Sequence, residues 1–523
     1  MRKKMKLKKL MALCLSLVMA VGMFAMNASA SIGEADKGTI NVSGVEDGVT
    51  VNAYRLMDVS YDYDADQPLE PTYTWNDSVA AWVRTNYPTY IGEGADDTVQ
   101  KAFADAEDIA LATFYDALAA AIKNTTSPLE VPVAGTCTGS GSITGLDMGN
   151  YLILIENGMR VYRPSAVNVV PSWNEEDKEW VMTSPTVEVK SSEVSIDKSV
   201  NEDVNDGHDS GKDKAEQGSD NANIGDTVSF DLRAGIPQYP ENAIFKTYTV
   251  SDVLPAGLTL NEGTVTVKGV TGEGETDLTG TDAYTSSEVR PGELGASSFT
   301  LTFDYDKIKT YESVHIEYTA VLNKDAAIGT TGNKNTAYLD YSNNPYSATY
   351  QTKSDFVTVY SYGIDITKVN SEGDTLPGAQ FELSTTDGGE AISFIGTEGS
   401  YRRALSGESG VTTLEVDESG KLVLTGLDAG TWYLKETKAP DGYHKPSESV
   451  SILISDDDRN GSVTVGQEEL DSGIVPVEIE NSQGITLPTT GGIGTILFTV
   501  GGILLMGLGL TLFLVIVRRR KAS

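Results

Sequence analysis

The sequence predicts a mainly β chain that consists of three β-sandwich domains in series. Short runs in which apolar and polar residues alternate, such as GTINVSG, TVTVKGV and SVHIEYTAVL, recur along the chain. Gly, Asn and Asp separate these runs, as expected for strands joined by turns. About 460 residues lie between the two ends of the chain, which is enough for three sandwiches of ordinary size.

The two ends are predicted to be targeting segments. Residues 1–30 combine a basic start, an apolar core and the small-residue ending NASA, which is typical of a secretory signal peptide. Residues 493–517 carry no charge and are long enough for a transmembrane helix, and the basic tail of residues 518–523 would stay in the cytoplasm. We therefore expect an exported chain whose C-terminus is first held in the membrane.

Three domains are expected between these ends: residues 31–188, 191–358 and 360–483. A helical insertion is expected in the first domain, within residues 97–124. Its apolar residues at helical spacing are Phe103, Ala106, Ile109, Ala110, Phe114 and Leu118. The polar stretch 201–223 in the second domain is predicted to be a solvated loop, because its Asp and Asn spacing resembles a calcium loop only loosely.

Composition argues against several partners and sites. The chain has 39 basic and 75 acidic residues, a net charge of −36, which disfavours nucleic acid and anionic lipid as partners. Only Cys137 remains after removal of the signal, so no intramolecular disulfide can form. His208, His315 and His444 are widely separated, and no spacing indicates a metal, phosphate or hydrolase site. We expect no cofactor, no metal and no enzymatic turnover.

A five-residue motif directly precedes the C-terminal apolar segment. The motif consists of Leu487, Pro488, Thr489, Thr490 and Gly491. Motif, apolar span and basic tail in this order resemble the LPXTG cell-wall sorting signal of Gram-positive surface proteins. The resemblance implies that a sortase cysteine attacks the Thr490–Gly491 bond and that the acyl group on Thr490 then passes to an amine. Proline restricts the backbone and glycine leaves room for a nucleophile.

A glutamate stands where a strand of the third domain should be apolar. In the run TWYLKETKAPDGYH, Glu436 follows Trp432 and Leu434 in alternation, so we expect it on the apolar face. A buried carboxylate is costly unless it is protonated or paired. An ion pair with a nearby lysine is one way to satisfy this requirement.

The segment around Glu436 also resembles the glutamate-bearing segment of Cna-B-like domains, the immunoglobulin-like sandwiches of Gram-positive pilins and adhesins. The resemblance implies an intramolecular isopeptide bond between Lys368 in the first strand and Asn481 in the last, with Glu436 as the catalytic group. Burial lowers a lysine pKa and raises a carboxyl pKa, which suits an amine nucleophile and an acid. The ion pair remains the alternative interpretation.

The second domain resembles the corresponding pilin domain and implies a second bond of this kind. Lys198 in SIDKSV is the candidate nucleophile, Asp252 in TYTVSDVLPAGLTL the catalytic acid, and Asn335 in GNKNTAYLDYSNNP the acceptor. Asn333 would share a strand face with Asn335 and is the rival acceptor. No bond is expected in the first domain, where Ser191 replaces the asparagine that related pilins carry after the pilin lysine.

Pilus shafts also need a lysine that accepts Thr490 of the next subunit. The stretch VVPSWNEEDKEWVMTSPTVEVKSS resembles the pilin motif of shaft subunits and places the acceptor at Lys190. It departs from the motif at Glu188 and Val189, because no Tyr-Pro precedes the lysine.

The whole chain thus resembles a major, or backbone, pilin. This implies that a pilin-type sortase joins Thr490 to Lys190 of an identical neighbour in a head-to-tail polymer. Accessory pilins, and peptidoglycan reached through the housekeeping sortase, are further expected partners of this secreted, wall-anchored chain. A monomeric wall-anchored adhesin, which needs no acceptor lysine, and an accessory pilin stay open as alternatives.

Overall fold

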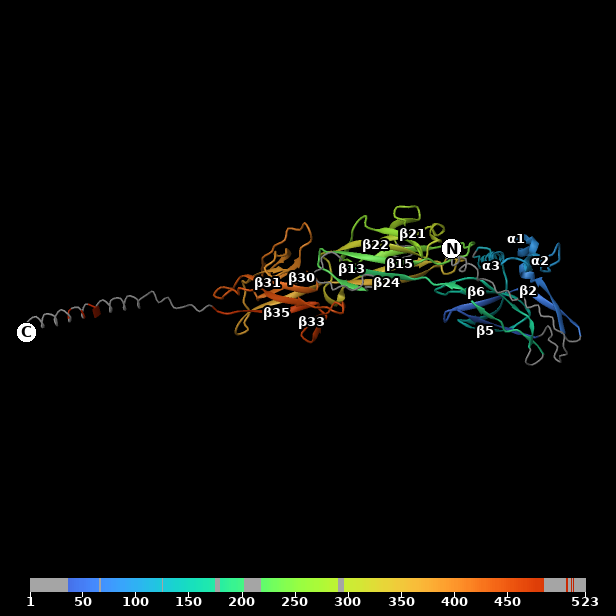
Figure 1. The fold of residues 1–523 in the computed structure, drawn as a ribbon, viewed down its shortest axis with the longest axis horizontal. Coiled ribbons are helices and arrows are strands. Elements are labelled where there is room, and N and C mark those ends of the chain that lie inside the picture. Colours follow the sequence, from blue (N-terminus) through green and yellow to red (C-terminus); the bar gives the residue numbers. More distant parts are fainter. Residues whose placement is uncertain are drawn as a thin grey trace, which may run out of the picture. The chain divides into compact units, whose positions relative to one another are not determined.

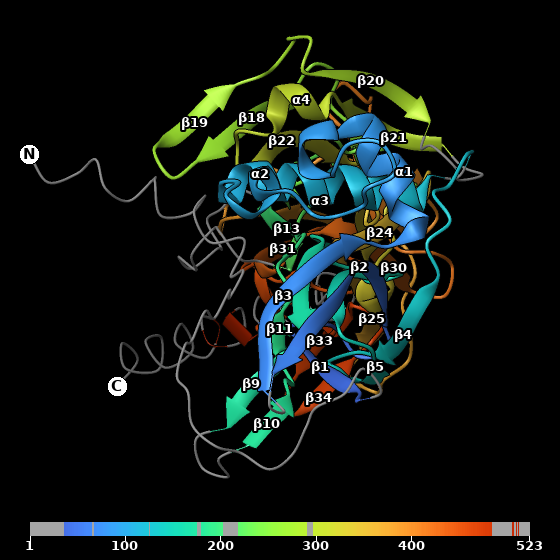
Figure 2. The ribbon, with the colours of Figure 1, turned by 90° about the vertical axis from the view of Figure 1, so that its right-hand side faces the viewer.

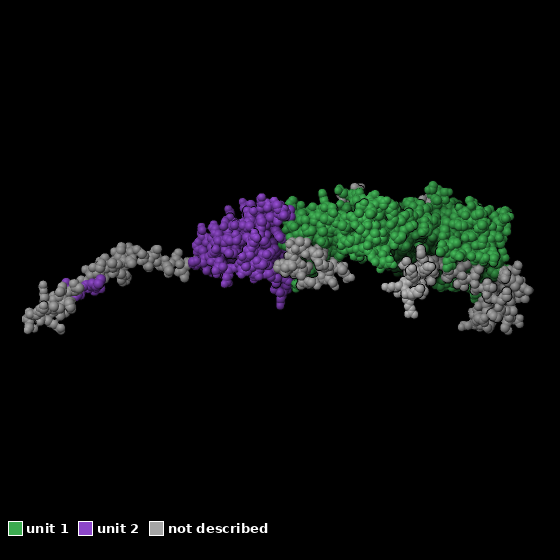
Figure 3. Space-filling view, turned by 45° about the horizontal axis from the view of Figure 1, so that its top comes forward, with its two compact units in different colours: residues 1–361, 457–461 green, residues 362–456, 462–523 purple. Residues whose placement is uncertain are grey.

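The computed structural model describes residues 36–64, 67–124, 126–174, 179–201, 218–289 and 296–483, with four single positions from Leu505 to Thr511. The described chain is mainly β, which confirms the predicted fold class (Figure 1). It forms two compact units, residues 1–361 with 457–461 and residues 362–456 with 462–523 (Figure 3). Below, the sheets of residues 36–192 are called the N-terminal domain, those of 196–360 the middle domain, and those of 362–483 the C-terminal domain.

Two sheets face each other in the N-terminal domain. Its strands are β1 (Gly38–Ser43), β2 (Thr50–Asp64), β3 (Gln67–Trp75), β4 (Val133–Thr138), β5 (Gly141–Leu146), β6 (Gly149–Glu156), β7 (Val161–Tyr162), β8 (Ser165–Val169), β9 (Pro171–Asn174), β10 (Glu179–Met182), β11 (Thr186–Glu188) and β12 (Ser191–Ser192). One sheet has the order β3-β2-β6-β8 with β4 on β2, and the other has the order β11-β1-β5. Buried Ile40, Val51, Ile143 and Ile153 fill the space between them.

A helical insertion separates β3 from β4, as predicted, but its phase differs from the prediction. It comprises α1 (Asp77–Asn86), η2 (Pro88–Tyr90), α2 (Lys101–Ala104) and α3 (Asp108–Lys123), which lie together beside β2 and β6 (Figures 1 and 2). Ile109, predicted on the apolar face, is 76% exposed, and Ala110 is exposed too. The helix breaks between α2 and α3, so the buried stripe of α3 starts again at Leu111 and continues through Phe114 and Leu118.

The middle domain is a sandwich of two six-stranded sheets. Its strands are β13 (Ile196–Asn201), β14 (Ser219–Asn221), β15 (Thr227–Gly235), β16 (Tyr248–Val253), β17 (Leu258–Leu260), β18 (Thr266–Thr271), β19 (Gly274–Asp277), β20 (Tyr284–Val289), β21 (Ala296–Phe303), β22 (Ser313–Leu322), β23 (Asn333–Tyr341) and β24 (Gln351–Tyr360), with short helices α4 (Tyr305–Ile308) and η3 (Gly329–Thr331). One sheet has the order β13-β15-β22-β18-β19 with β17 on β22, and the other β14-β24-β23-β16-β21-β20.

Part of the predicted loop 201–223 is strand in the structure. Residues 219–221 form β14, which pairs in parallel with β24, and Asp220 within it is buried. The prediction was wrong for these residues because it was based on polarity alone. Backbone pairing with a neighbouring strand decides the conformation instead. Residues 202–217 lie outside the described part of the chain, so the solvated loop remains a prediction there.

The C-terminal domain contains a five-stranded sheet and a four-stranded sheet. Its strands are β25 (Tyr362–Asn370), β26 (Gln380–Ser384), β27 (Phe394–Thr397), β28 (Ser400–Arg403), β29 (Leu414–Glu415), β30 (Lys421–Leu427), β31 (Gly430–Lys438), β32 (Val450–Ile454), β33 (Val463–Val465), β34 (Glu468–Leu470) and β35 (Ile474–Asn481). The orders are β27-β28-β30-β25-β35 and β29-β26-β31-β32, and β33 pairs with β34. The first and last strands, β25 and β35, are parallel neighbours.

Candidate functional site

The first candidate site lies in the core of the middle domain. Alternation along β13 turns Ile196, Lys198 and Val200 toward the facing sheet, so the Lys198 side chain is fully buried. The backbone N–H of Lys198 donates to Asp355 Oδ2 at 2.7 Å, which adds a contact from β24. A lysine in an apolar strand face requires a partner, because an unpaired buried charge is strongly unfavourable.

Asp252, Tyr318 and Asn335 surround the Lys198 amine. Lys198 Nζ contacts Asp252 Oδ2 and donates to the Tyr318 hydroxyl at 2.8 Å, and Asn335 Nδ2 donates to the same hydroxyl at 2.7 Å. Asp252 on β16 and Asn335 on β23 come from one sheet, while Lys198 and Tyr318 come from the other. The structure therefore brings together the three residues that the sequence indicated and adds a tyrosine that it did not.

Burial dominates the electrostatics of this site. Desolvation lowers the pKa of Lys198, although Asp252 opposes the shift, and desolvation raises the pKa of Asp252, although Lys198 opposes it. The rings of Phe230 and Tyr318 lie 5.5 and 5.4 Å from Lys198 Nζ and keep water away. Both shifts favour a neutral amine beside a neutral carboxylic acid, which is the form in which an amine can attack a carbonyl carbon.

Two oxygen atoms of the site are left for further contacts. Asp252 Oδ1 and Asn335 Oδ1 are buried and have no hydrogen-bond partner within the described residues. A buried polar atom without a partner is costly. Two such oxygens, one from a carboxyl group and one from an amide, are therefore typical of a reactive site. A protonated Asp252 could donate to the amide oxygen of Asn335 and polarise its carbonyl.

The rival acceptor, Asn333, is engaged elsewhere. Its Nδ2 donates to the carbonyls of Ala327 and Val359 at 3.1 and 3.0 Å, and its Oδ1 accepts from the Ala327 N–H at 2.9 Å. These contacts tie the loop before η3 to β24. The geometry therefore favours Asn335 over Asn333 as the residue beside Lys198.

The second candidate site lies in the C-terminal domain and uses a different arrangement. The parallel register of β25 and β35 sets Lys368 opposite Ile479 and brings Asn481 close on the same sheet. Glu436 enters from β31 of the facing sheet, and its Oε1 accepts from Asn481 Nδ2 at 2.8 Å. Lys368 Nζ donates to the carbonyls of Ile479 and Val369 at 2.7 and 3.2 Å.

Burial again sets the protonation states of this second site. Lys368, Glu436 and Asn481 are 0%, 4% and 1% exposed. Desolvation raises the pKa of Glu436, opposed by Asn481 and Lys368, and desolvation lowers the pKa of Lys368. Glu436 Oε2 and Asn481 Oδ1 have no partner within the described residues, as in the first site. Glu436 thus lies on the apolar face, where its position in the alternation predicted it.

Lys190 lies between β11 and β12, where the N-terminal domain joins the middle domain. Val187 and Val189 before it are buried, and Lys190 itself is half-buried. The Lys190 carbonyl accepts from the Arg163 N–H at 2.9 Å, and the Val189 N–H donates to the Ser43 carbonyl at 2.9 Å. Backbone bonds on both sides of the lysine therefore hold it on a defined segment.

Several predicted segments lie outside the described residues. These are the signal peptide, residues 1–30; the sorting motif with Thr490, residues 487–491; the basic tail, residues 518–523; and, apart from four single positions, the apolar span 493–517. Among the residues that are described, no helix is both long and apolar enough to cross a bilayer.

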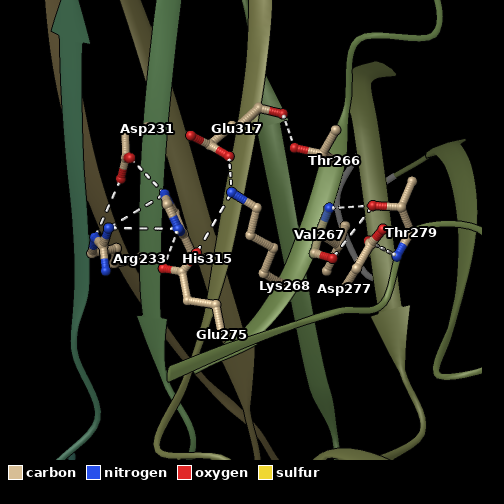
Figure 4. Close-up of polar contacts among 10 residues, drawn as sticks. All are labelled: Asp231, Arg233, Thr266, Val267, Lys268, Glu275, Asp277, Thr279, His315 and Glu317. Carbon is tan, nitrogen blue, oxygen red and sulfur yellow. Dashed lines mark hydrogen bonds and ion pairs between the residues drawn. The ribbon is translucent and has the colours of Figure 1, made fainter. Parts of the chain in front are cut away.

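A charged cluster lies on the outer face of the middle-domain sheet that contains β15, β22, β18 and β19, and the sequence analysis missed it. His315 Nε2 lies 2.5 Å from Asp231 Oδ2, and His315 Nδ1 lies 3.0 Å from Glu275 Oε1 (Figure 4). Lys268 Nζ donates to Glu317 Oε2 at 2.6 Å. Ligand atoms of Asp231, His315 and Glu317 lie within 4.8 Å of one another, as in a cation site.

The cations already present in this cluster argue for a different role. Lys268 neutralises Glu317, and the Arg233 guanidinium lies 3.5 Å from both ring nitrogens of His315. The cluster joins residues of four strands, so no short motif marks it in the sequence. We interpret it as a network of ion pairs around His315.

Three family models match successive parts of the chain. The Cna-B-like domain of the Gram-positive pilin backbone subunit 2 matches residues 224–345, a prealbumin-like fold domain matches residues 363–469, and the LPXTG cell wall anchor motif matches residues 479–523. The first match includes Asp252 and Asn335 and the second includes Lys368 and Glu436, whereas Lys198 and Asn481 lie outside these two matches.

Known relatives agree with these matches. The chain is 30% identical over 253 residues to the trypsin-resistant surface T6 protein of Streptococcus pyogenes serotype M6, an alignment that covers 44% of this chain and 42% of that protein. The chain thus spans less than half the length of this relative. The solved T6 backbone pilin of serotype M6 Streptococcus pyogenes, which has a modular three-domain structure, shares the fold, with a TM-score of 0.56, 21% identity, and coverage of 87% of this chain and 100% of that one. The chain therefore carries a Cna-B-like pilin-backbone domain, a prealbumin-like fold domain and an LPXTG cell wall anchor motif, in that order.

Proposed function

We propose that this protein is the structural backbone subunit of a covalent pilus on the cell surface. The observation that supports this function best is the presence of a buried lysine, acid and asparagine set in each of two successive domains. Internal cross-links suit a fibre subunit that must resist shear and proteases without disulfides.

Each set would form one isopeptide bond, Lys198–Asn335 and Lys368–Asn481. The neutral amine attacks the amide carbon, the new Nζ–Cγ bond forms, the Cγ–Nδ2 bond breaks, and ammonia leaves. Asp252 and Glu436 would accept a proton from the lysine and polarise the asparagine carbonyl. The reaction occurs once per site and joins residues of the same chain. The protein therefore modifies itself without turnover and is not an enzyme.

Polymerisation would use two further residues. A pilin-type sortase would cut the Thr490–Gly491 bond and pass the Thr490 acyl group to Lys190 of a neighbouring subunit. This contact joins different surfaces of identical chains, so it extends without closing. The housekeeping sortase would then attach the finished fibre to peptidoglycan, and accessory pilins could join the same fibre.

Intact mass of residues 31–490, produced without sortase, tests the internal bonds. Each bond removes one ammonia, about 17 Da. The wild-type chain should lack two ammonias, and Asp252→Ala and Glu436→Ala should each lack one. A wild-type mass equal to the sequence mass would contradict both bonds and leave the two lysines as buried ion-pair partners.

The alternative functions differ in their need for an acceptor. A monomeric wall-anchored adhesin could carry both internal bonds and would still need no acceptor lysine. An accessory pilin would join a fibre without repeating along it. The half-buried position of Lys190 on a defined segment between two domains favours the backbone role.

A further inference from the structure

The Tyr318 hydroxyl contacts both nitrogen atoms that the middle-domain reaction would exchange. It accepts from Lys198 Nζ, the attacking nitrogen, at 2.8 Å and from Asn335 Nδ2, the leaving nitrogen, at 2.7 Å. The ring is fixed by a stack on Phe230, with centroids 5.0 Å apart, and by an edge contact with Phe299 at 5.1 Å. The hydroxyl is thus held between the two nitrogens by rigid packing.

We propose that Tyr318 is a catalytic residue of the middle-domain site, and that its hydroxyl carries a proton from the Lys198 nitrogen to the departing Asn335 nitrogen. This inference rests on the proposed Lys198–Asn335 bond. It assigns the proton transfer to the tyrosine because the attacking and leaving nitrogens both contact its hydroxyl.

The proton balance of the reaction calls for a proton carrier, and the Tyr318 hydroxyl lies where one can act. When the amine attacks, its nitrogen must lose one proton, and the amide nitrogen must gain one before it leaves as ammonia. A hydroxyl between them can accept the first proton and donate its own, so it ends in its starting state. The Nζ–Cγ bond forms, the Cγ–Nδ2 bond breaks, and no other reactant is needed.

Asp252 has a separate task in this scheme. It contacts the lysine amine directly and can take the extra proton of the ammonium form. Once protonated, Asp252 no longer attracts the phenolic hydrogen, which can then turn toward Asn335 Nδ2. Its Oδ1 and the Asn335 Oδ1 both lack partners within the described residues, so the new acid proton can polarise the amide carbonyl.

The state of the phenol suits this transfer. Burial, and then the nearby Asp252 carboxylate, raise the pKa of Tyr318 well above its ordinary value. The hydroxyl therefore stays protonated and keeps a proton to give. Because the ring is fully buried, bulk water cannot easily substitute for it.

The C-terminal site offers an internal control in the same chain. Within the described residues, the hydrogen bonds of Lys368 Nζ run to the carbonyls of Ile479 and Val369, and Asn481 Nδ2 donates to Glu436. No tyrosine hydroxyl joins the two nitrogens there in that part of the chain. The two sites should therefore respond differently to the loss of one phenol.

The test is the mass of the processed chain with Tyr318→Phe, followed over time after synthesis. General acid–base groups typically contribute 100-fold or more to a rate. The variant should retain the ammonia of the middle domain, or lose it roughly 100-fold more slowly, while the C-terminal domain loses its ammonia at the wild-type rate. Peptide mapping assigns each 17 Da loss to its site.

Tyr248→Phe is the matched control. Tyr248 lies in the same core, and its hydroxyl donates to the Ala234 carbonyl at 2.9 Å, away from the reacting nitrogens. It should leave both ammonia losses unchanged. If Tyr318→Phe reacts as fast as the wild type, Tyr318 only packs and the inference is wrong. If the wild type shows no middle-domain loss, the underlying bond is wrong instead.

A fluorotyrosine at position 318 keeps the experiment decisive if the phenylalanine variant folds poorly. Fluorine on the ring makes the hydroxyl more acidic while nearly preserving its shape. If Tyr318 carries the proton, the rate of middle-domain ammonia loss should change, and the dependence of that rate on pH should shift. Pulse synthesis at low temperature captures the rate. An unchanged rate and profile would overturn the catalytic role, because packing does not depend on hydroxyl acidity.

Discussion

His315 makes the middle domain sensitive to pH at the level of one side chain. The ring is only 4% exposed, and both of its nitrogens face carboxylates, those of Asp231 and Glu275. The hydrogen bond to Asp231 is the main cause of a raised His315 pKa, while desolvation and Arg233 oppose it. Lys268 and Glu317 complete the charged surroundings. The folded state therefore favours the imidazolium form.

The sign of the pH effect follows from this shift. Below the unfolded pKa of about 6.5 the histidine is protonated in both states, so its contribution to the free energy of unfolding is fully present. As pH rises through the raised folded pKa, that contribution is lost. His315→Gln should therefore destabilise the domain by about 1 kcal/mol at pH 5.5 and by much less at pH 8.5.

Urea unfolding at the two pH values measures this difference. His444→Gln is the matched control, because His444 is exposed in the C-terminal domain. A destabilisation by His315→Gln that is equal at both pH values would show that the imidazole contributes by packing and not by charge.

Asn333 and Asn335 show how two positions on one strand face can serve different purposes. Asn333 joins three backbone groups, so Asn333→Ala should lower the free energy of unfolding by about 1–3 kcal/mol. It should leave the two-ammonia mass deficit intact, whereas Asn335→Ala should reduce the deficit to one ammonia. Intact mass and urea unfolding of the two variants measure the difference. A deficit of only one ammonia in Asn333→Ala, with two in Asn335→Ala, would make Asn333 the acceptor.

At the scale of elements, the segment between β11 and β12 carries the proposed acceptor. Backbone bonds hold Lys190 there, and its side chain is half-buried. Co-expression with a pilin-type sortase should produce a ladder of covalent multimers, and Lys190→Arg should remove it, because a guanidinium is a poor nucleophile. Lys101→Arg, at a lysine with 86% side-chain exposure, is the control and should leave the ladder unchanged.

The outcome separates the backbone pilin from the alternatives. A ladder that persists in Lys190→Arg would move the acceptor to another lysine. No ladder from the wild type, with internal bonds present, would favour the monomeric adhesin.

The arrangement of strands also explains why the two lysine sites differ. In the middle domain the lysine and asparagine belong to facing sheets, so the bond would cross the core. In the C-terminal domain they belong to the neighbouring parallel strands β25 and β35, so the bond would join the first and last strands of one sheet. The catalytic carboxyl comes from the sheet opposite the lysine in both cases.

At the scale of the whole molecule, the internal bonds would replace disulfides. Each bond would close a loop of roughly 100 residues or more, and a cross-link of that size stabilises by about 4–5 kcal/mol in the loop-entropy description. The Asp252→Ala/Glu436→Ala double variant should therefore unfold at much lower urea and be cut faster by trypsin.

Comparison with a second variant separates the bond from the carboxyl itself. Asn335→Ala/Asn481→Ala keeps both acids but also blocks both bonds, so it should lose the stability that the cross-links contribute. If it stays as stable and trypsin-resistant as the wild type, the cross-links are not the source of the resistance.

Local pattern determined the class of the chain and, in the C-terminal domain, the strand face on which Glu436 lies. Alternation along single strands predicted the β-rich fold and set Glu436 on an apolar face, because side-chain direction in a strand depends only on position. Helical spacing indicated the insertion, but the break between α2 and α3 shifted the buried stripe to Leu111, and Ile109 turned outward.

Contacts between distant strands were decided only by the tertiary structure. Tyr318 meets Lys198 and Asn335 because two sheets face each other, and His315 meets Asp231 and Glu275 because β15, β22 and β19 belong to one sheet. Burial, which shifts the pKa of Lys198 and Asp252, likewise arises from packing. A sequence specifies the direction of each side chain along its own strand, whereas its partners depend on sheet order and register, which are set by the packing of the complete domain.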